Sequence, residues 1–278
     1  MSATLGVAAA LFSALAQATA HALLAKGTDK LLIRGIIGVT TLLAVLPFIP
    51  FVPLPSSELW WWLLASGALH AVYQLVLIRA YEGEDFSVAF PLARGIVPLA
   101  TGILGVAYLG DELSRSALIG IIIVSAGLLY IASARRPAYA GMLAALLAGL
   151  LTTAYTVLDA YAVRLDPVLW TFIVWFFVFD GLIMGSIVLL WRGKELKGAL
   201  AAEWKPGLQA GLASLLGFSA ALIALRLIPV GSAAALRETS VVFGVLIAAV
   251  FLKEQVANRR LLGALLVAFG GVLIALSR

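Results

Sequence analysis

Two arginines lie inside long apolar stretches of this sequence, where charged side chains are rare. Arg94 lies between Pro91 and Pro98, and Arg237 is followed directly by Glu238. Pro98 has no backbone N–H, so it cannot donate a helical hydrogen bond to the carbonyl of Arg94. The guanidinium of Arg94 and this unbonded carbonyl oxygen are therefore expected at the same depth in the membrane. Guanidinium groups bind carboxylates in a bidentate manner. Arg94 and Arg237 are therefore predicted to bind an anionic ligand, and the alternative for Arg94 is to hold two helices together through backbone carbonyls.

Four other ionisable residues in apolar stretches are candidates for carrying a proton. They are Glu238, Asp180, Asp159 and His21. Glu238 either carries a proton or pairs with Arg94, and a structural salt bridge is the alternative for Asp180 and Asp159. Histidine binds and releases protons near neutral pH, although a lone buried histidine more commonly makes only a hydrogen bond to a neighbouring helix.

Polar residues recur at helical spacing on three otherwise apolar stretches. Residues three or four positions apart share one face of a helix, so each stripe predicts a polar face, and the three faces together predict one wet cavity. The stripes are Gln17 with His21, His70 with Gln74, and Thr152, Thr156 and Asp159 with Tyr155 beside them; the predicted substrate-binding set is Arg94, Arg237, His70, Gln74, Gln17 and Tyr155.

The composition of the 278-residue chain indicates a membrane protein. Hydrophobic residues make up 63% of the chain and charged residues 12%, and the mean hydropathy is +1.09. Soluble domains contain about 25% charged residues, so this chain has too little polar surface to cover a fold in water. A spanning helix requires about 20 mainly apolar residues, which predicts an all-α membrane protein of ten transmembrane helices. The predicted spans are residues 4–25, 31–52, 58–80, 86–109, 114–134, 138–163, 167–191, 205–227, 231–252 and 259–277.

Several chemistries have no support in the sequence. The chain has no cysteine, which excludes disulfides, thiol catalysis and cysteine-ligated metals. It also has no H-E-x-x-H, no Gly-rich phosphate loop and no G-x-S-x-G. We predict no metal, no cofactor and no enzyme activity; a membrane-embedded enzyme is a distant alternative, because a Ser-His-Asp set need not be local. The net charge of +5 comes from basic residues in short loops, which suits lipid headgroups rather than nucleic acid.

The sequence resembles itself with a shift of 143 residues, which predicts two halves of five helices each. Five is odd, so the second half would enter the membrane in the opposite sense. Such an inverted repeat is typical of transporters that work by alternating access. The repeated glycines, seven residues apart in each half, predict close packing of the fifth and tenth helices. The halves are residues 1–136 and 137–278, and the aligned pairs include Arg94 with Arg237, Asp111 with Glu254, Gly120 with Gly263 and Gly127 with Gly270.

The basic residues are distributed unequally between the two sides of the membrane. Eleven lie on the side that the first span reaches and four on the other side, while four lie within the spans. The positive-inside rule therefore places the first group in the cytoplasm and both termini outside. Arg34, Arg79 and Arg226 lie near predicted helix ends and are expected to extend toward the membrane surface.

Short motifs in both halves resemble those of a known family. Leu-Gly-Asp-Glu-Leu-Ser at 109–114 and Leu-Lys-Glu-Gln at 252–255 follow the fourth span of each half, and Phe90-Pro91-Leu-Ala-Arg94-Gly95 lies between the third and fifth spans. With ten spans in two halves, the chain resembles the EamA branch of the drug/metabolite transporter superfamily. This resemblance implies secondary transport, usually export, of amino acids, nucleosides, drugs or other metabolites, and one branch exports opine-type metallophores.

The resemblance also implies features from which this chain departs. Characterised amino-acid exporters of the family keep both termini in the cytoplasm, against the charge distribution here. Small multidrug relatives couple to protons through a glutamate in the first helix, whereas residues 4–25 contain no carboxylate.

These observations predict a secondary transporter that exports a small polar, multiply charged metabolite across the inner (cytoplasmic) membrane by alternating access. An amino acid or an amino-acid derivative such as an opine-type metallophore fits two deep arginines better than a lipophilic drug does, since a drug needs an aromatic cavity and one carboxylate. A multidrug exporter is the alternative. The predicted partners are the small-molecule substrate, the lipid bilayer and a proton as the coupling ion, with the chain as a monomer or homodimer.

Overall fold

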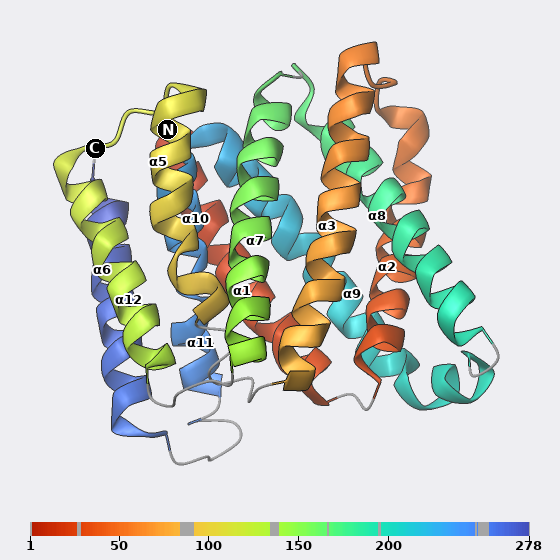
Figure 1. Cartoon of the computed structure of the whole chain (residues 1–278). Helices are drawn as coiled ribbons and strands as arrows, with labels where there is room; N and C mark the ends of the chain where they lie inside the picture. The colour runs from red at the N-terminus through yellow and green to blue at the C-terminus, as the bar shows by residue number, and fades with distance from the viewer. Residues whose placement is uncertain are drawn as a thin grey trace.

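The protein is a bundle of helices, as its computed structural model shows for residues 2–26, 29–83, 92–133, 139–165, 167–193, 196–247, 249 and 256–277. In Figure 1, α6 and α12 stand at one edge of the bundle, and α2 and α8 stand at the other. The elements are α1 (Ser2–Lys26), α2 (Lys30–Val45), the 3-10 helix η1 (Leu46–Phe51), α3 (Ser57–Gly83), α5 (Val97–Leu109), α6 (Arg115–Ala132), α7 (Tyr139–Leu165), α8 (Leu169–Arg192), α9 (Leu196–Leu227), α10 (Val230–Arg237), α11 (Ser240–Leu246) and α12 (Asn258–Leu276).

Nine helical segments within the described residues are long and apolar enough to cross a membrane. They correspond to every predicted span except 231–252, so the number of ten stays a prediction. Large apolar side chains cover the outside of the bundle; Leu190, for example, is 82% exposed. A water-soluble protein does not expose a continuous apolar surface of this kind, whereas lipid tails solvate it.

The predicted span 231–252 is not one continuous helix. It contains α10 and α11, which are separated by a turn at Glu238 and Thr239. The hydroxyl of Thr239 donates to the carbonyl of Leu236 at 2.6 Å, and the N–H of Thr239 bonds the same carbonyl at 3.1 Å. Hydroxyl side chains that capture nearby backbone groups compete with α-helical bonds, so the chain tightens here without proline or glycine.

The predicted span 86–109 is interrupted as well. Residues 92–95 form a helical turn, Ile96 is a turn residue, and α5 then begins at Val97 with Pro98 in its first turn. Proline is favoured at this position because its missing N–H is not needed there. Residues 86–91 lie outside the described part of the chain.

The helix α9 starts earlier than the predicted span 205–227. It begins at Leu196 and continues through Pro206 to Leu227. The predicted span begins at Lys205, whereas the helix also includes the nine preceding residues, among them the charged residues Lys197 and Glu203. The helix is therefore longer than the part suited to lipid, which begins at Glu203.

The helices pair in a pattern that respects the sequence repeat. The closest partners are α1 with α9, α3 with α7, α2 with α8, α5 with α10 and α6 with α12. A shift of 143 residues exchanges the first two pairings with each other and maps the pairs α2–α8 and α6–α12 onto themselves. The helices α5 and α10 belong to the fourth and ninth predicted spans, and the same shift relates these two spans to each other. Each of these five pairs joins a helix of 1–136 to a helix of 137–278, so the contact between the halves runs through the whole bundle.

Glycines allow α6 and α12 to touch backbone to backbone. A Cβ atom added to Gly120 would lie 2.7 Å from the carbonyl oxygen of Gly270, and one added to Gly127 would lie 2.9 Å from that of Gly263. These distances are too short for any side chain. The close packing predicted from the glycine spacing is therefore confirmed.

We expect Gly120→Ala to destabilise the protein by about 1–3 kcal/mol, because the new methyl group must push two backbones apart. Thermal unfolding of the purified protein in detergent would show a lower midpoint. Gly185→Ala is the matched control, since its Cβ would meet only Val39 at 3.7 Å. Equal midpoints for the two variants would contradict the packing argument.

Candidate functional site

A cavity of about 130 Å³ lies between the helices. Its size is close to that of an engineered cavity of about 150 Å³ that binds benzene, so it has room for a small organic group. All six predicted substrate-binding residues line it. The lining includes Gln17, His70, Gln74, Arg94, Tyr155 and Arg237, together with His21 and Asp180 from the predicted proton carriers.

The other two predicted proton carriers lie behind the wall of this cavity. Asp159 on α7 and Glu238 at the end of α10 are both fully buried and do not line it. Each touches a residue that does line the cavity, His70 and Arg94 respectively. They therefore contact the cavity through a partner.

Arg94 and Glu238 form an ion pair between the two halves of the sequence. Arg94 donates from Nη1 to Oε1 of Glu238 at 3.0 Å, and the two residues are 4% and 1% exposed. Of the two roles predicted for Glu238, pairing with Arg94 is confirmed. The other carboxylate oxygen, Oε2, is buried and has no hydrogen-bond partner among the described residues.

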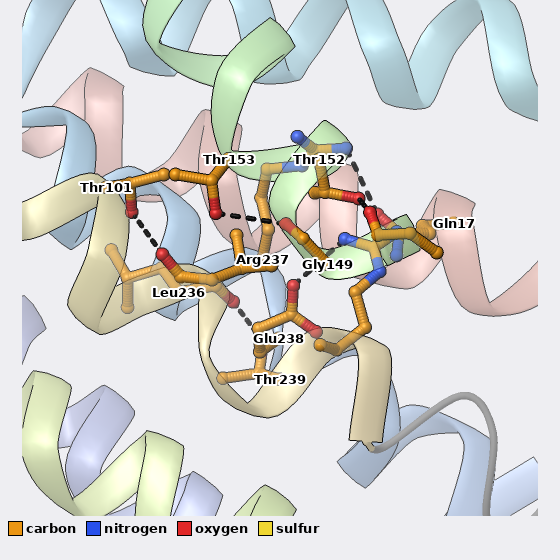
Figure 2. A network of polar contacts seen from close by, with 12 residues as sticks. Gln17, Thr101, Gly149, Thr152, Thr153, Leu236, Arg237, Glu238 and Thr239 are labelled. Carbon is orange, nitrogen blue, oxygen red and sulfur yellow. Dashed lines mark hydrogen bonds and ion pairs between the residues drawn. The ribbon is translucent and has the colours of Figure 1, made fainter. Parts of the chain in front are cut away.

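Arg237, beside Glu238 in sequence, points to a different partner. Its Nη2 donates to Oε1 of Gln17 on α1 at 3.1 Å, and Figure 2 shows these two side chains directed toward each other. Its guanidinium also lies over the ring of Phe218, 5.8 Å from the ring centre. Arg237 is only 7% exposed, and no carboxylate of the described residues forms an ion pair with it.

Two donors of this Arg237–Gln17 pair have no hydrogen-bond acceptor among the described residues. They are Nε of Arg237 and Nε2 of Gln17, both buried and without hydrogen-bond partners in the described part of the chain. A buried donor without an acceptor costs about 1–3 kcal/mol, and more when it is charged. Both residues line the cavity, so an acceptor group entering it would remove this cost.

Gln74 on α3 joins a cation and a carboxylate on the cavity wall. Nε of Arg34 donates to its Oε1 at 2.5 Å, and its Nε2 donates to Oδ1 of Asp180 at 2.9 Å. Arg34 was expected to extend toward the membrane surface, and this expectation was wrong for a physical reason: the Gln74 oxygen offers it a partner inside the bundle. The side chain of Arg79 lies outside the described part.

Arg226, near the end of α9, binds backbone carbonyls, and its extension toward the membrane surface stays a prediction. It donates to the carbonyls of Val163 and Pro167, both at 3.0 Å, where α7 ends. It does not line the cavity.

His70 lies on α3, one helical turn before Gln74, and forms a pair with Asp159 of α7. Nε2 of His70 lies 3.0 Å from Oδ2 of Asp159, and the hydroxyl of Ser66 donates to Oδ1 of Asp159 at 2.5 Å. The imidazole packs on the ring of Tyr155, with 3.9 Å between the ring centres. Asp159 thus holds the orientation of a histidine that itself lines the cavity.

Aromatic side chains form much of the cavity wall, and of these rings sequence analysis identified only Tyr155. Phe176 and Phe218 pack against His70, with ring centres at 4.8 and 5.1 Å, and Tyr73 packs against Tyr155 at 5.2 Å. All of these rings line the cavity. Aromatic residues in an apolar span are common, so only their spacing relative to His70 could have indicated this role.

The described residues contain no group of three or more His, Asp or Glu side chains that could hold a metal ion. The polar groups of the cavity instead form separate pairs and chains. Their chemistry is hydrogen bonding and ion pairing.

Comparison with known proteins gives a class of protein, the membrane transporters, that agrees with a bundle of apolar helices around a polar cavity. The model of the EamA-like transporter family matches residues 2–133 and again residues 139–276. The chain therefore belongs to the EamA-like transporter family, as the sequence motifs predicted. EamA-like proteins are membrane transporters.

A structural comparison supports the fold alone. A solved structure, described only as "Crystal structure of protein", superimposes with a TM-score of 0.76 at 17% sequence identity, covering 98% of this chain and 96% of the other. The search of curated proteins returned no match.

We expect Glu238→Ala to destabilise the protein by about 3–5 kcal/mol, because it removes the carboxylate from a buried ion pair. Unfolding in detergent, followed by heat or denaturant, would measure the loss. The double variant Arg94→Leu with Glu238→Leu should be less destabilised, since it removes both charges.

The matched control is Glu58→Ala, which removes a carboxylate from an exposed position at the start of α3. It should change the stability by less than about 1 kcal/mol. If Glu238→Ala were equally mild, the Arg94–Glu238 pair would have no structural importance.

Proposed function

We propose that this protein is a secondary transporter that exports a small polar metabolite carrying a carboxylate and further charged groups. Amino acids and amino-acid derivatives, including opine-type metallophores, belong to this class. The proposed location is the inner (cytoplasmic) membrane. The observation that carries the proposal is Arg237, a buried cation on the cavity wall with an unfilled donor and no carboxylate partner among the described residues.

The electrostatics of this site favour an anionic group. An isolated charge buried in a protein is costly unless it is paired, and Glu238 is already engaged by Arg94. A substrate carboxylate would receive hydrogen bonds from Nε of Arg237 and from Nε2 of Gln17. Charge-assisted bonds of this kind are about twice as strong as neutral ones.

Other parts of the cavity suit the rest of such a molecule. Asp180 lines the cavity and uses Oδ1 to accept from Gln74, so this carboxylate supplies a negative region for an amino group. The rings of Phe176, Phe218 and Tyr155 supply an apolar face between the charged regions. A zwitterion with an apolar middle matches this distribution.

Alternating access is supported by the interrupted helices. Arg94 lies two residues before the turn at Ile96, and Arg237 is the last residue of α10. Transporters built from inverted repeats bind substrates near such breaks at the middle of the membrane. We propose that the two halves form an inverted repeat of five spans each and that they move around this cavity.

We propose His70 and Asp159 as the proton-carrying pair. Asp159 of α7 contacts the imidazole from behind the cavity wall. The described ionisable groups that line the cavity together with His70 are Tyr155 from α7, Tyr73 from its own helix, Asp180 from α8, Arg237 from α10, Arg94 before α5, Arg34 from α2 and His21 from α1. Within the part of the chain that the structure describes, Asp159 is the group that shares a hydrogen bond with the imidazole. This contact with a histidine is the reason that we choose Asp159 from the candidates Glu238, Asp180, Asp159 and His21.

The aromatic wall supports a second candidate function, a multidrug exporter. Neighbouring rings such as Phe176 and Phe218, with centres 4.7 Å apart and planes tilted by 33°, offer aromatic surface to flat apolar molecules. The two functions differ in the importance of Arg237. A lipophilic drug has no group for its unfilled donor.

The substrate class can be tested with cells that produce the protein. Metabolites in the culture medium of producing and non-producing cells would be compared, and the purified protein would then be titrated with the compounds that accumulate. We expect Arg237→Ala to weaken binding about 10- to 100-fold, the effect of losing a charged hydrogen bond, and to abolish accumulation.

Arg115→Ala is the matched control, because Arg115 is exposed at the start of α6. It should transport normally. If Arg237→Ala also transports normally while folded, the carboxylate site is refuted, and if only lipophilic drugs accumulate outside the cells, the multidrug function replaces the proposed one.

Coupling to protons gives a separate test. In proteoliposomes, transport of the identified substrate should follow an imposed pH gradient, and Asp159→Asn should remove this response while substrate binding persists. Arg115→Ala serves again as control. A full response in Asp159→Asn would exclude the His70–Asp159 pair as the proton carrier.

A further inference from the structure

The motif Leu-Gly-Asp after α5 forms a tight turn at one end of the bundle. Gly110 has a φ of +68°, a left-handed conformation that favours glycine. It ends α5, and the N–H of the next residue, Asp111, bonds back to the carbonyl of Gly105 at 3.0 Å. The turn thus directs the Asp111 carboxylate back toward its neighbours in the bundle.

Asp111 binds two separate partners with its two oxygens. Oδ1 accepts from Nη1 of Arg164 on α7 at 2.7 Å, and Oδ2 accepts from the backbone N–H of Val230 at 2.6 Å. Val230 is the first residue of α10, where a carboxylate is favoured by the free N–H groups of the helix start. We call Asp111, Arg164 and the first turn of α10 the brace.

Arg164 extends the brace to α9. Its Nε donates to the carbonyl of Leu225 at 2.9 Å and its Nη2 to that of Ile228 at 3.1 Å. Arg164 therefore ties the end of α7 to the turn after α5 and to the connection between α9 and α10. Asp111 belongs to residues 1–136 and its partners to residues 137–278, so the brace joins the two halves.

Close backbone contact surrounds the brace. A Cβ on Gly105 would lie 2.4 Å from Val230, and one on Gly231 would lie 2.5 Å from the Cα of Gly102. The helices α5 and α10 therefore touch backbone to backbone at Gly102 and Gly231, and the side chain of Val230 packs directly against Gly105. Nothing the size of a metabolite passes between them while these contacts persist.

The brace and the cavity lie toward opposite ends of the bundle. The brace lies where α5, α7 and α9 end, and in Figure 1 the N-terminus lies at the same end. The cavity wall extends the other way, to His21 near the end of α1, Arg34 near the start of α2 and Ile78 near the end of α3. The brace thus closes one end of the bundle, and the cavity lies toward the other end.

From this arrangement we infer that the brace is the gate of one membrane face, held shut by Asp111 and Arg164 and linked to the substrate site by α10. Val230 and Arg237 are the first and last residues of this eight-residue helix, which is about 12 Å long at 1.5 Å per residue. Because the helix is short and rigid, a movement of Arg237 at its end also moves the backbone N–H of Val230, to which Asp111 is bonded. Arg164 is 26% exposed, so water can solvate it when the gate opens.

This inference rests on the proposed transport function, but its test requires no substrate. The chain contains no cysteine, so Ser13→Cys introduces a single thiol on the cavity wall. A membrane-impermeant sulfonated maleimide would be applied to intact cells and, separately, to inverted membrane vesicles. We expect this thiol to be labelled from one face only, the face opposite the brace.

Adding Asp111→Ala or Arg164→Ala should raise labelling from the brace face about tenfold or more, the effect of losing charged hydrogen bonds on the population of an open state. Arg259→Ala is the matched control, because Arg259 also joins helices of the two halves, donating to the carbonyl of Tyr130 at 3.1 Å and to Ser133 at 2.6 Å, outside the brace. It should leave labelling from the brace face unchanged.

Asp111→Asn and Arg164→Gln replace the alanine variants if those do not insert in the membrane. Unchanged labelling from the brace face in folded Asp111 and Arg164 variants would overturn the gate, as would an equal increase in Arg259→Ala, which would indicate general loosening. Neither result would affect the substrate site, which the Arg237 variants test alone.

Discussion

The pairing of Arg94 with Glu238 is the interaction on which the arrangement of the cavity depends. Three charges are buried close together, two positive and one negative, and only one pair can form. Because Glu238 is held by the other half of the chain, its neighbour Arg237 is left with a neutral partner, Gln17. The residual positive charge therefore lies on the cavity wall. The location of this positive charge follows from the pairing of Glu238 with Arg94 rather than with Arg237.

Sequence reasoning succeeded where the signal was local and strong. The apolar lengths predicted nine of the spans, and the glycine spacing predicted close packing of α6 and α12, although not that each packs against the other. The helical spacing predicted polar faces that meet in one cavity, and all six predicted residues line it. It failed at the break after Arg237, because no proline or glycine marks it. The carbonyl of Leu236 is captured by the Thr239 hydroxyl, and such a capture depends on backbone geometry that a sequence does not specify.

The partners of buried polar groups were also beyond prediction. Arg34 lies near a helix end, where exposure costs little, yet it contacts Gln74 from a different helix. The aromatic wall has the same origin: Phe176 and Phe218 come from α8 and α9, and only the packing of these helices around His70 brings the rings together. The inversion of the second half and the tenth span stay predictions.

The glycine contacts between α6 and α12 (Gly120 with Gly270 and Gly127 with Gly263), called the seam below, have a consequence for how such a protein can diversify. Within the described residues, no lining group of the cavity comes from either helix. The seam can therefore hold the halves together whatever the cavity contains. Cavity residues are therefore free to change in evolution. New substrate specificities can arise on the same fold while the contact between α6 and α12 stays as it is.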